Sequence, residues 1–199
     1  MDRVTVVSSM NLDVHRIILG LWMAVFVVWA IAGGRAKRTV RAQSDLRARA
    51  PLWVVLVAWM LLLSPRFRPG LLGLRFVPMS DAAAYAGLAI AVIGLGFAVW
   101  ARFHIGRNWD ALVALKENHQ LVRTGPYAIV RHPIYSGFIL ATLGTAITQG
   151  DVGGLLSTAL IAIAWGYKSR VEEVFMIEAF GAEYEQYRRE VKALVPFVW

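Results

Sequence analysis

The chain has 199 residues, of which 58% are hydrophobic and 17% are charged, and its mean hydropathy is +0.55. Charged residues make up about a quarter of a soluble globular domain, so this composition excludes an ordinary soluble protein. Cysteine is absent, which excludes disulfides and thiolate metal sites. The net charge of +8 is explained by basic cytoplasmic loops beside anionic lipid. Since no recognised nucleic-acid-binding motif accompanies the charge, we expect no nucleic-acid partner.

Several apolar runs carry no charged residue and are candidates for membrane spans. They are residues 17–34, 51–64, 82–101, 133–150 and 152–167. A helix needs roughly 20 residues to cross the bilayer core, with about 17 as a practical minimum, and the stem of Lys168 can extend the last run. The run at 51–64 is short, and whether it crosses the bilayer fully is open. The sequence predicts an all-α, polytopic membrane protein with about five transmembrane helices and a C-terminal cytosolic amphipathic helix.

Basic residues are distributed unevenly among the loops, and this asymmetry predicts the orientation. Loops 33–50 and 101–133 are rich in Arg and Lys, whereas loop 64–81 carries few basic residues. Because cytoplasmic loops carry the excess of positive charge, the N-terminus is predicted outside and the C-terminus in the cytoplasm of a bacterial inner membrane. Basic residues follow the first apolar run directly, in place of a cleavage site, so this run is predicted to be a retained anchor.

The last two apolar runs are separated only by residues 149–151 and are predicted to form a tight helical hairpin. The hairpin brings the segment around His132 next to the stretch that follows Lys168. That stretch is charged and amphipathic, and we expect it to extend the last helix with a break near Gly181.

Polar residues concentrate between the third and fourth apolar runs, in a stretch punctuated by Gly and Pro. In the motif His119-Gln-Leu-Val, an extended backbone can pair with a purine edge while Leu121 and Val122 cover its face. The alternative is a loop that packs two apolar side chains under the membrane domain. Gly125-Pro-Tyr127 predicts a tight turn, from which Tyr127 can stack or donate a hydrogen bond, although an isolated turn has no functional meaning.

The motif Arg131-His-Pro-Ile-Tyr135 opens the fourth apolar run. Pro is favoured in the first turn of a helix, so Pro133 is predicted to begin the helix here. A helix start presents unpaired N–H groups and a partial positive charge, which stabilise a carboxylate docked beside His132 and Tyr135. The alternative is that Arg131 and His132 are ordinary interfacial anchors.

The stretch after the last apolar run supplies carboxylates and cations. Lys168 and Glu172 share one helix face, as do Ser169 and Glu173, and Arg170 precedes Glu173 by one turn. A carboxylate here can hold a ligand's ammonium or ribose hydroxyls, and a nearby cation can hold a substrate carboxylate. The alternative is a solvated helix face.

The histidines give no indication of a metal site. They are His15, His104, His119 and His132. None has a recognisable ligand spacing with carboxylates, so no metal is expected.

Together these motifs resemble the isoprenylcysteine carboxyl methyltransferase family of integral membrane methyltransferases. The resemblance covers about residues 100–199. It rests on His119-Gln-Leu-Val, Gly125-Pro-Tyr127, Arg131-His-Pro-Ile-Tyr-Ser-Gly137, the pair Glu172-Glu173, and Phe180-Gly-Ala-Glu-Tyr-Glu-Gln-Tyr187. It implies one membrane-embedded methyltransferase domain over residues 1–199, with N-terminal spans in 1–100 and a cofactor-binding half in 101–199.

The resemblance implies S-adenosylmethionine as the methyl donor, bound on the cytosolic face. The implied cofactor-binding residues are His119, Leu121, Val122, Tyr127, His132, Pro133, Ile134, Tyr135, Glu172 and Glu173. A cation shortly before the carboxylate resembles the family's partner for the substrate carboxylate, which implies a catalytic set of Lys168, Arg170 and Glu172. Which glutamate and which cation acts is open.

The expected function is methyl transfer to a lipophilic acceptor at the membrane–cytosol interface, with a prenylcysteine-type carboxylate favoured. An ionised carboxylate needs no general base, so the protein has mainly to align the reactants and exclude water. The alternatives are a phospholipid or small-thiol methyltransferase, an NADPH-dependent sterol-type reductase of similar architecture, and a membrane scaffold without enzymatic activity.

Overall fold

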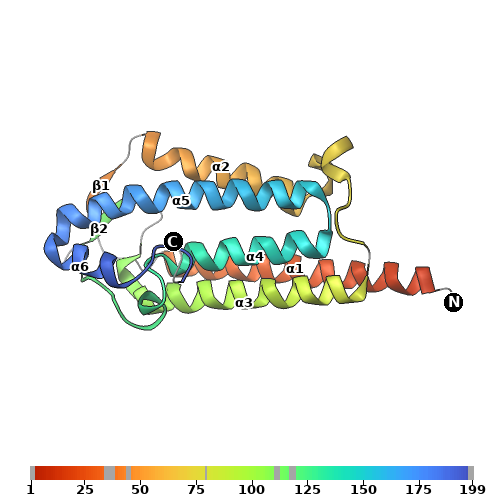
Figure 1. The fold of residues 1–199 in the computed structure, drawn as a ribbon, viewed down its shortest axis with the longest axis horizontal. Coiled ribbons are helices and arrows are strands. Elements are labelled where there is room, and N and C mark those ends of the chain that lie inside the picture. The colour runs from red at the N-terminus through yellow and green to blue at the C-terminus, as the bar shows by residue number, and fades with distance from the viewer. Residues whose placement is uncertain are drawn as a thin grey trace.

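A computed structural model describes residues 3–33, 39–43, 46–78, 80–109, 113–116 and 120–196. Long helices that alternate in direction form its body, with the shorter α6 at the end where α5 finishes (Figure 1). The helices are α1 (Arg3–Gly33), α2 (Leu46–Leu63), α3 (Asp81–Ile105), α4 (Pro133–Gln149), α5 (Val152–Phe180) and α6 (Ala182–Glu190). Short 3-10 turns are η1 (Pro65–Phe67), η2 (Gly70–Gly73), η3 (Gly106–Asn108) and η4 (Gly125–Ala128). The prediction of a helical architecture is confirmed.

A small two-stranded sheet adds to the helices. Strands β1 (Thr39–Gln43) and β2 (Val113–Lys116) pair antiparallel, with an irregularity between Thr39 and Arg41. The sequence analysis assigned both segments to loops and so missed this sheet. Its strands are far apart in the chain, and each is too short to show a strand pattern by itself.

The number of membrane spans stays a prediction. By length and composition, the segments Asp13–Gly33 and Asp81–Asn108 are able to cross a membrane, and Arg49–Leu63 is a shorter apolar helix. Helix α2 begins at Leu46, ahead of the apolar run, and continues through Pro51. The added turn is basic, so the apolar part of α2 remains short.

The helical hairpin and both predicted helix boundaries are confirmed. Helix α4 begins at Pro133, and Gly150 ends it in a left-handed conformation with φ of 68°. The Asp151 side chain accepts a hydrogen bond of 2.9 Å from the Gly154 N–H and thereby caps α5. Gly181, with φ of 54°, separates α5 from α6 as predicted.

Helices α3 and α4 approach closely through glycines that face each other. A Cβ atom added at Gly94 would lie 2.6 Å from the carbonyl oxygen of Gly137, and one at Gly87 would lie 2.6 Å from that of Gly144. Real Cβ atoms do not approach this closely, so the contact requires residues without side chains. The close packing fixes α4 against α3 along much of its length.

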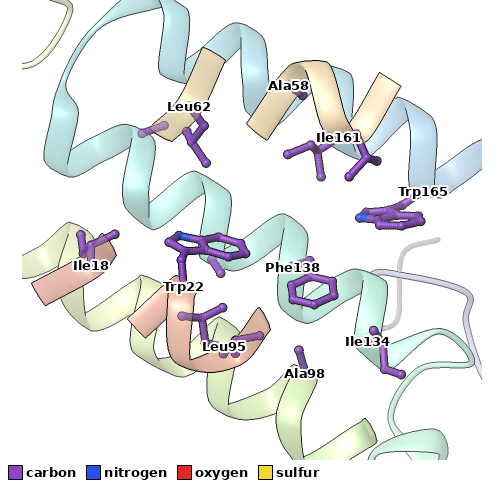
Figure 2. Close-up of a cluster of buried hydrophobic side chains, with 14 of the residues drawn as sticks. Ile18, Trp22, Ala58, Leu62, Leu95, Ala98, Ile134, Phe138, Ile161 and Trp165 are labelled. Carbon is purple, nitrogen blue, oxygen red and sulfur yellow. The ribbon is translucent and has the colours of Figure 1, made fainter. Parts of the chain in front are cut away.

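An aromatic cluster joins the helices in the middle of the molecule. Figure 2 shows Trp22 of α1 and Phe138 of α4 near the centre of this core, with Trp165 of α5 and Ile134 of α4 nearer one end. The rings of Trp22 and Phe138 stack at 6.0 Å, and the Trp22 indole N–H donates to the Thr145 hydroxyl at 3.1 Å. Burial of such large rings contributes strongly to packing, and it positions α4 and α5 for the site described next.

Candidate functional site

An open cavity lies where α4 begins and the second half of α5 meets α6. Its walls come from the end of α3, η3, the segment after residue 119, η4, α4, α5 and α6. The lining residues are Ile105, Asn108, Trp109, Gln120, Leu121, Val122, Tyr127, Arg131, His132, Pro133, Ile134, Tyr135, Glu172, Met176, Tyr184 and Tyr187. The cavity therefore combines apolar side chains with a cluster of charged ones.

Most of the predicted cofactor-binding residues line this cavity. They are Leu121, Val122, Tyr127, His132, Pro133, Ile134, Tyr135 and Glu172. His119 lies outside the described residues. Glu173 and Lys168 lie behind the cavity wall, in contact with residues that form it. Arg170 is exposed and lines a separate, charged groove with Arg188 and Lys192.

His132 lies between the two adjacent glutamates of α5. Its Nδ1 is 3.4 Å from a Glu172 carboxylate oxygen, and its Nε2 is 3.2 Å from a Glu173 carboxylate oxygen. The Tyr135 hydroxyl donates to Glu172 at 2.5 Å, and Lys168 Nζ donates to the same oxygen at 2.9 Å. The prediction that the hairpin brings the His132 segment against the two glutamates is confirmed.

The two glutamates have different surroundings. Arg131 donates to Glu173 through Nε at 2.9 Å and through a terminal nitrogen at 2.5 Å, and Arg188 Nε lies 3.3 Å from the other oxygen. Glu173 is thus held by arginines on the side away from the cavity. Glu172 lines the cavity itself, and its side chain keeps 18% of its accessible surface. Of the two carboxylates, Glu172 is the one that lines this cavity, whereas Glu173 lines the separate charged groove.

The charges of this cluster stabilise one another. Burial alone would raise the pKa of the Glu172 carboxyl, but Lys168, His132 and the Tyr135 hydrogen bond outweigh it and hold that pKa at about 2. Burial likewise disfavours a charged His132, yet hydrogen bonds to Glu172 and Glu173 raise the pKa of its imidazole. For Glu173, burial is outweighed by His132 and Arg131, and its pKa is lowered. Both carboxylates are therefore ionised at neutral pH.

The rings of His132, Tyr135 and Trp165 form a stack that begins in this cluster. His132 and Tyr135 lie 5.6 Å apart with an interplanar angle of 4°, and Tyr135 and Trp165 lie 4.5 Å apart at 3°. Trp165 is buried in the core, so the stack extends from the packed interior to the cavity wall. This stack fixes the ring plane of His132, because a buried partner supports each ring in turn.

Residues 191–196, which we term the C-terminal strap, hold the start of α4 in place. The Arg131 N–H donates to the Lys192 carbonyl at 2.8 Å, and the His132 N–H donates to the Ala193 carbonyl at 3.0 Å. The Ser136 hydroxyl donates to the Leu194 carbonyl at 2.6 Å. Since Pro133 has no N–H, the first free helix N–H groups available to a ligand are those of residues 134 and 135.

Several cavity residues were not predicted as site residues. They are Ile105, Asn108, Trp109, Gln120, Arg131, Met176, Tyr184 and Tyr187. The Asn108 side-chain oxygen is buried and has no hydrogen-bond partner among the residues that the structure describes. The Tyr187 hydroxyl donates to the Tyr127 carbonyl at 2.5 Å, which joins α6 to η4. The spacing of Tyr184 and Tyr187 by one turn on α6 was the available signal, because both can face one side of a helix.

Metal binding has no visible basis in the part of the chain that the structure describes. No group of three or more His, Asp or Glu side chains there is arranged to hold a metal ion. The carboxylates of the cluster are already paired with arginine, histidine, lysine and tyrosine side chains.

Comparisons with known proteins agree on one family. Residues 82–183 match the family model described as phospholipid methyltransferase. A probable protein-S-isoprenylcysteine O-methyltransferase of Oryza sativa subsp. indica is 31% identical over 120 residues, which cover 58% of this chain and 62% of that protein. The protein-S-isoprenylcysteine O-methyltransferase of Schizosaccharomyces pombe is 38% identical over 104 residues, covering 49% and 43%. The chain thus spans less than two thirds of the length of these relatives.

A solved structure shares the fold. It is that of the eukaryotic intramembrane Ras methyltransferase, isoprenylcysteine carboxyl methyltransferase. The TM-score is 0.51 with 23% sequence identity, and the match covers 78% of this chain and 55% of that one. At this identity the likeness establishes the fold alone.

Proposed function

The chain belongs to the phospholipid methyltransferase family, alongside the isoprenylcysteine carboxyl methyltransferases, and from this premise we propose that it methylates a prenylcysteine-type carboxylate with S-adenosylmethionine as donor. The family assignment made from the sequence motifs is confirmed by these comparisons. The observation that carries the proposal is the cavity whose wall combines ionised Glu172 and His132 with apolar side chains. The relatives named as isoprenylcysteine methyltransferases favour this reaction over the reductase and scaffold alternatives.

The residues of the cavity fit the two ends of S-adenosylmethionine. Glu172 is an ionised acceptor suited to an ammonium group, and His132 with the N–H groups of residues 134 and 135 suits a carboxylate. Leu121 and Val122 offer apolar cover for a purine. The buried oxygen of Asn108, which has no partner within the described part of the chain, is a further acceptor for an N–H donor of a ligand. When bound, S-adenosylmethionine supplies a methyl group on a sulfonium, which is already a strong electrophile.

The chain's own residues then have two tasks: they align the methyl donor with the acceptor, and they exclude water from the cavity. A free α-carboxylate has a pKa of about 3.5, so it reaches the cavity as an anion and needs no general base. Of the predicted cations, Lys168 has the better position, because its Nζ lies 2.9 Å from Glu172 and 5.7 Å from the centre of the Tyr135 ring. Arg170 lines the separate groove instead. We therefore assign ligand contact to Glu172 and the positioning of its carboxylate to Lys168, and we keep Arg170 as the weaker candidate.

The membrane placement follows the sequence prediction. The molecule is an integral membrane protein, and we place its cavity at the cytosolic surface, with the N-terminus outside and the C-terminus in the cytoplasm of a bacterial inner membrane. The acceptor is a lipophilic molecule that reaches the cavity from the bilayer. This placement follows the excess of basic residues in the loops on the cavity side.

The test is methyl transfer from S-adenosylmethionine labelled in its methyl group. The purified chain in lipid vesicles is offered N-acetyl-S-farnesylcysteine, phosphatidylethanolamine and a total lipid extract. We expect label in the prenylcysteine as a base-labile methyl ester, and its loss in the Glu172→Gln variant. Label in phosphatidylethanolamine alone would overturn the assignment of a prenylcysteine-type carboxylate as the acceptor. Label in none of the three would overturn the methyltransferase assignment.

A further inference from the structure

A further cavity lies outside the candidate site, between the C-terminal parts of α1 and α3, and we propose that it binds one anionic phospholipid of the cytoplasmic leaflet. We term it the interhelical groove. Val28 and Ile31 of α1 and Phe103 of α3 provide apolar walls, and Arg102 and Arg107 provide cations. The groove therefore offers an apolar surface to the acyl chains of an anionic lipid and cations to its phosphate.

Arg102 carries a buried positive charge, and its contacts among the described residues are with neutral groups. The side chain is part of a residue with 3% of its surface exposed. Its terminal nitrogens donate to the carbonyls of Gly106 at 2.9 Å and Ala32 at 2.8 Å, and its guanidinium lies 4.5 Å from the centre of the Trp109 ring. Among the described residues no carboxylate pairs with this guanidinium. A buried charge without a counter-ion is costly, so an anionic group in the groove would be stabilised.

The apolar walls of the groove are exposed. Ile31 keeps 60% of its surface accessible and Phe103 keeps 63%. They lie on α1 and α3, the helices that contain the two segments able to cross a membrane by length and composition. An acyl chain fits beside Ile31 and Phe103, while the phosphate lies at the level of the arginines. A free phosphate would leave this apolar surface uncovered, and for that reason we assign the groove to a lipid.

The groove also adjoins a wall of the candidate site. Arg102 holds the Gly106 carbonyl and the Trp109 ring, and these residues flank Asn108 in η3. Asn108 and Trp109 line the cavity assigned to the cofactor. A phosphate bound at Arg102 would therefore stabilise this wall and tighten binding in the neighbouring cavity.

The experiment measures lipid binding directly and does not require methyl transfer. The full chain in neutral detergent is titrated with dioctanoylphosphatidylglycerol, and the number of bound lipids is read by native mass spectrometry. We expect one saturable site and about tenfold weaker binding in Arg102→Gln, with partial recovery in Arg102→Lys. Inorganic phosphate and glycerol 3-phosphate serve as headgroups without chains, and we expect neither to bind at the concentrations that saturate with lipid.

A second variant covers the case in which loss of Arg102 disturbs folding. Ile31→Trp fills the exposed apolar wall and should weaken lipid binding about tenfold, whereas Val27→Trp, on the same helix but outside the groove, should leave it unchanged. Equal lipid binding in wild type, Ile31→Trp and Arg102→Gln would overturn the proposal. Glycerol 3-phosphate binding as tight as that of the lipid would overturn the assignment to a lipid. Either failure leaves the proposed methyl transfer untouched.

Discussion

Two polar clusters lie at opposite ends of the hairpin formed by α4 and α5, and both contain buried charges. At the turn of the hairpin, Arg68 bonds to the Gln149 side chain at 2.8 Å and to the Asp151 carboxylate. Gln149 in turn donates to the Leu62 carbonyl at 2.5 Å. At the other end, His132 lies between Glu172 and Glu173.

The difference between the clusters is what their groups contact. In the turn cluster, the partners are one another and nearby backbone, and Asp151 also caps α5. In the second cluster, Glu172 and His132 are paired but also line a cavity together with apolar side chains. Burial of charge is thus common to a cluster that stabilises the helical turn and to the candidate ligand site. The two clusters differ in that ionised groups of the second one line an open cavity.

The largest expected effect is loss of cofactor binding in Glu172→Gln. The substitution keeps the side-chain shape but removes the charge that faces the cavity, so the affinity for S-adenosylhomocysteine should fall by roughly 100-fold, or about 3 kcal/mol. Calorimetric titration in detergent measures it. An unchanged affinity would exclude Glu172 from the ligand site.

A double variant separates binding from folding at this position. Glu172→Gln leaves the Lys168 ammonium buried without its carboxylate, which also lowers stability. Lys168→Met combined with Glu172→Gln removes the buried ammonium as well, and we expect thermal stability to recover while the cofactor affinity stays low. Recovery of both thermal stability and cofactor affinity would mean that Glu172→Gln lowers the affinity only by unfolding the site.

The turn cluster should behave in the opposite way. Asp151→Asn keeps a good helix cap but leaves the Arg68 guanidinium, whose side chain is 4% exposed, without its carboxylate. We expect a loss of about 2 kcal/mol in stability, seen as a lower melting temperature in detergent, and no change in S-adenosylhomocysteine affinity. A large loss of affinity would show that the two clusters are coupled.

The pH dependence of stability should report on the His132 cluster. The pKa of His132 is raised from 6.5, so its contribution is complete below pH about 6.5 and is lost as pH rises through the folded value. The pKa of Glu172 is lowered from 4.5 to about 2, so its contribution is complete above pH about 4.5 and is lost as pH falls through that range. We expect the melting temperature to be highest between these limits. His132→Asn should remove the fall on the alkaline side, and an unaltered profile would contradict the ion pairing.

The smallest expected effect concerns the C-terminal strap. Ser136→Ala removes one hydrogen bond to the Leu194 carbonyl, which should cost about 1 kcal/mol in stability. The start of α4 would be held less firmly, so we expect a two- to threefold weaker S-adenosylhomocysteine affinity by titration. Thr158→Ala on α5 also removes a hydroxyl-to-carbonyl bond but lies away from the strap, and its affinity should match wild type.

Local signals were sufficient for the hairpin and the helix boundaries. The short connection at residues 149–151, the Pro at 133 and the Gly at 181 each restrict the backbone at one point, and each prediction is confirmed. The hairpin then placed His132 beside Glu172 and Glu173 without further information. Spacing thus predicted that His132 and the two glutamates meet, whereas the other predicted cavity residues came from the family resemblance.

The remaining features depend on contacts between distant parts of the chain. The pairing of β1 with β2 and the strap on the start of α4 join short segments with no strong pattern of their own. Asn108 and Trp109 follow α3 and were not predicted as site residues, because nothing local shows that they line the cavity. Glu172 and Glu173 could not be distinguished, since only the structure shows that the arginines hold Glu173.

Titration of the wild-type chain with S-adenosylhomocysteine and with NADPH tests the central claim most directly, namely that the cavity beside His132 and Glu172 is a methyl-donor site. We predict saturable binding of S-adenosylhomocysteine with a dissociation constant on the order of micromolar, and no binding of NADPH. Saturation by NADPH, or by neither ligand, would contradict the account.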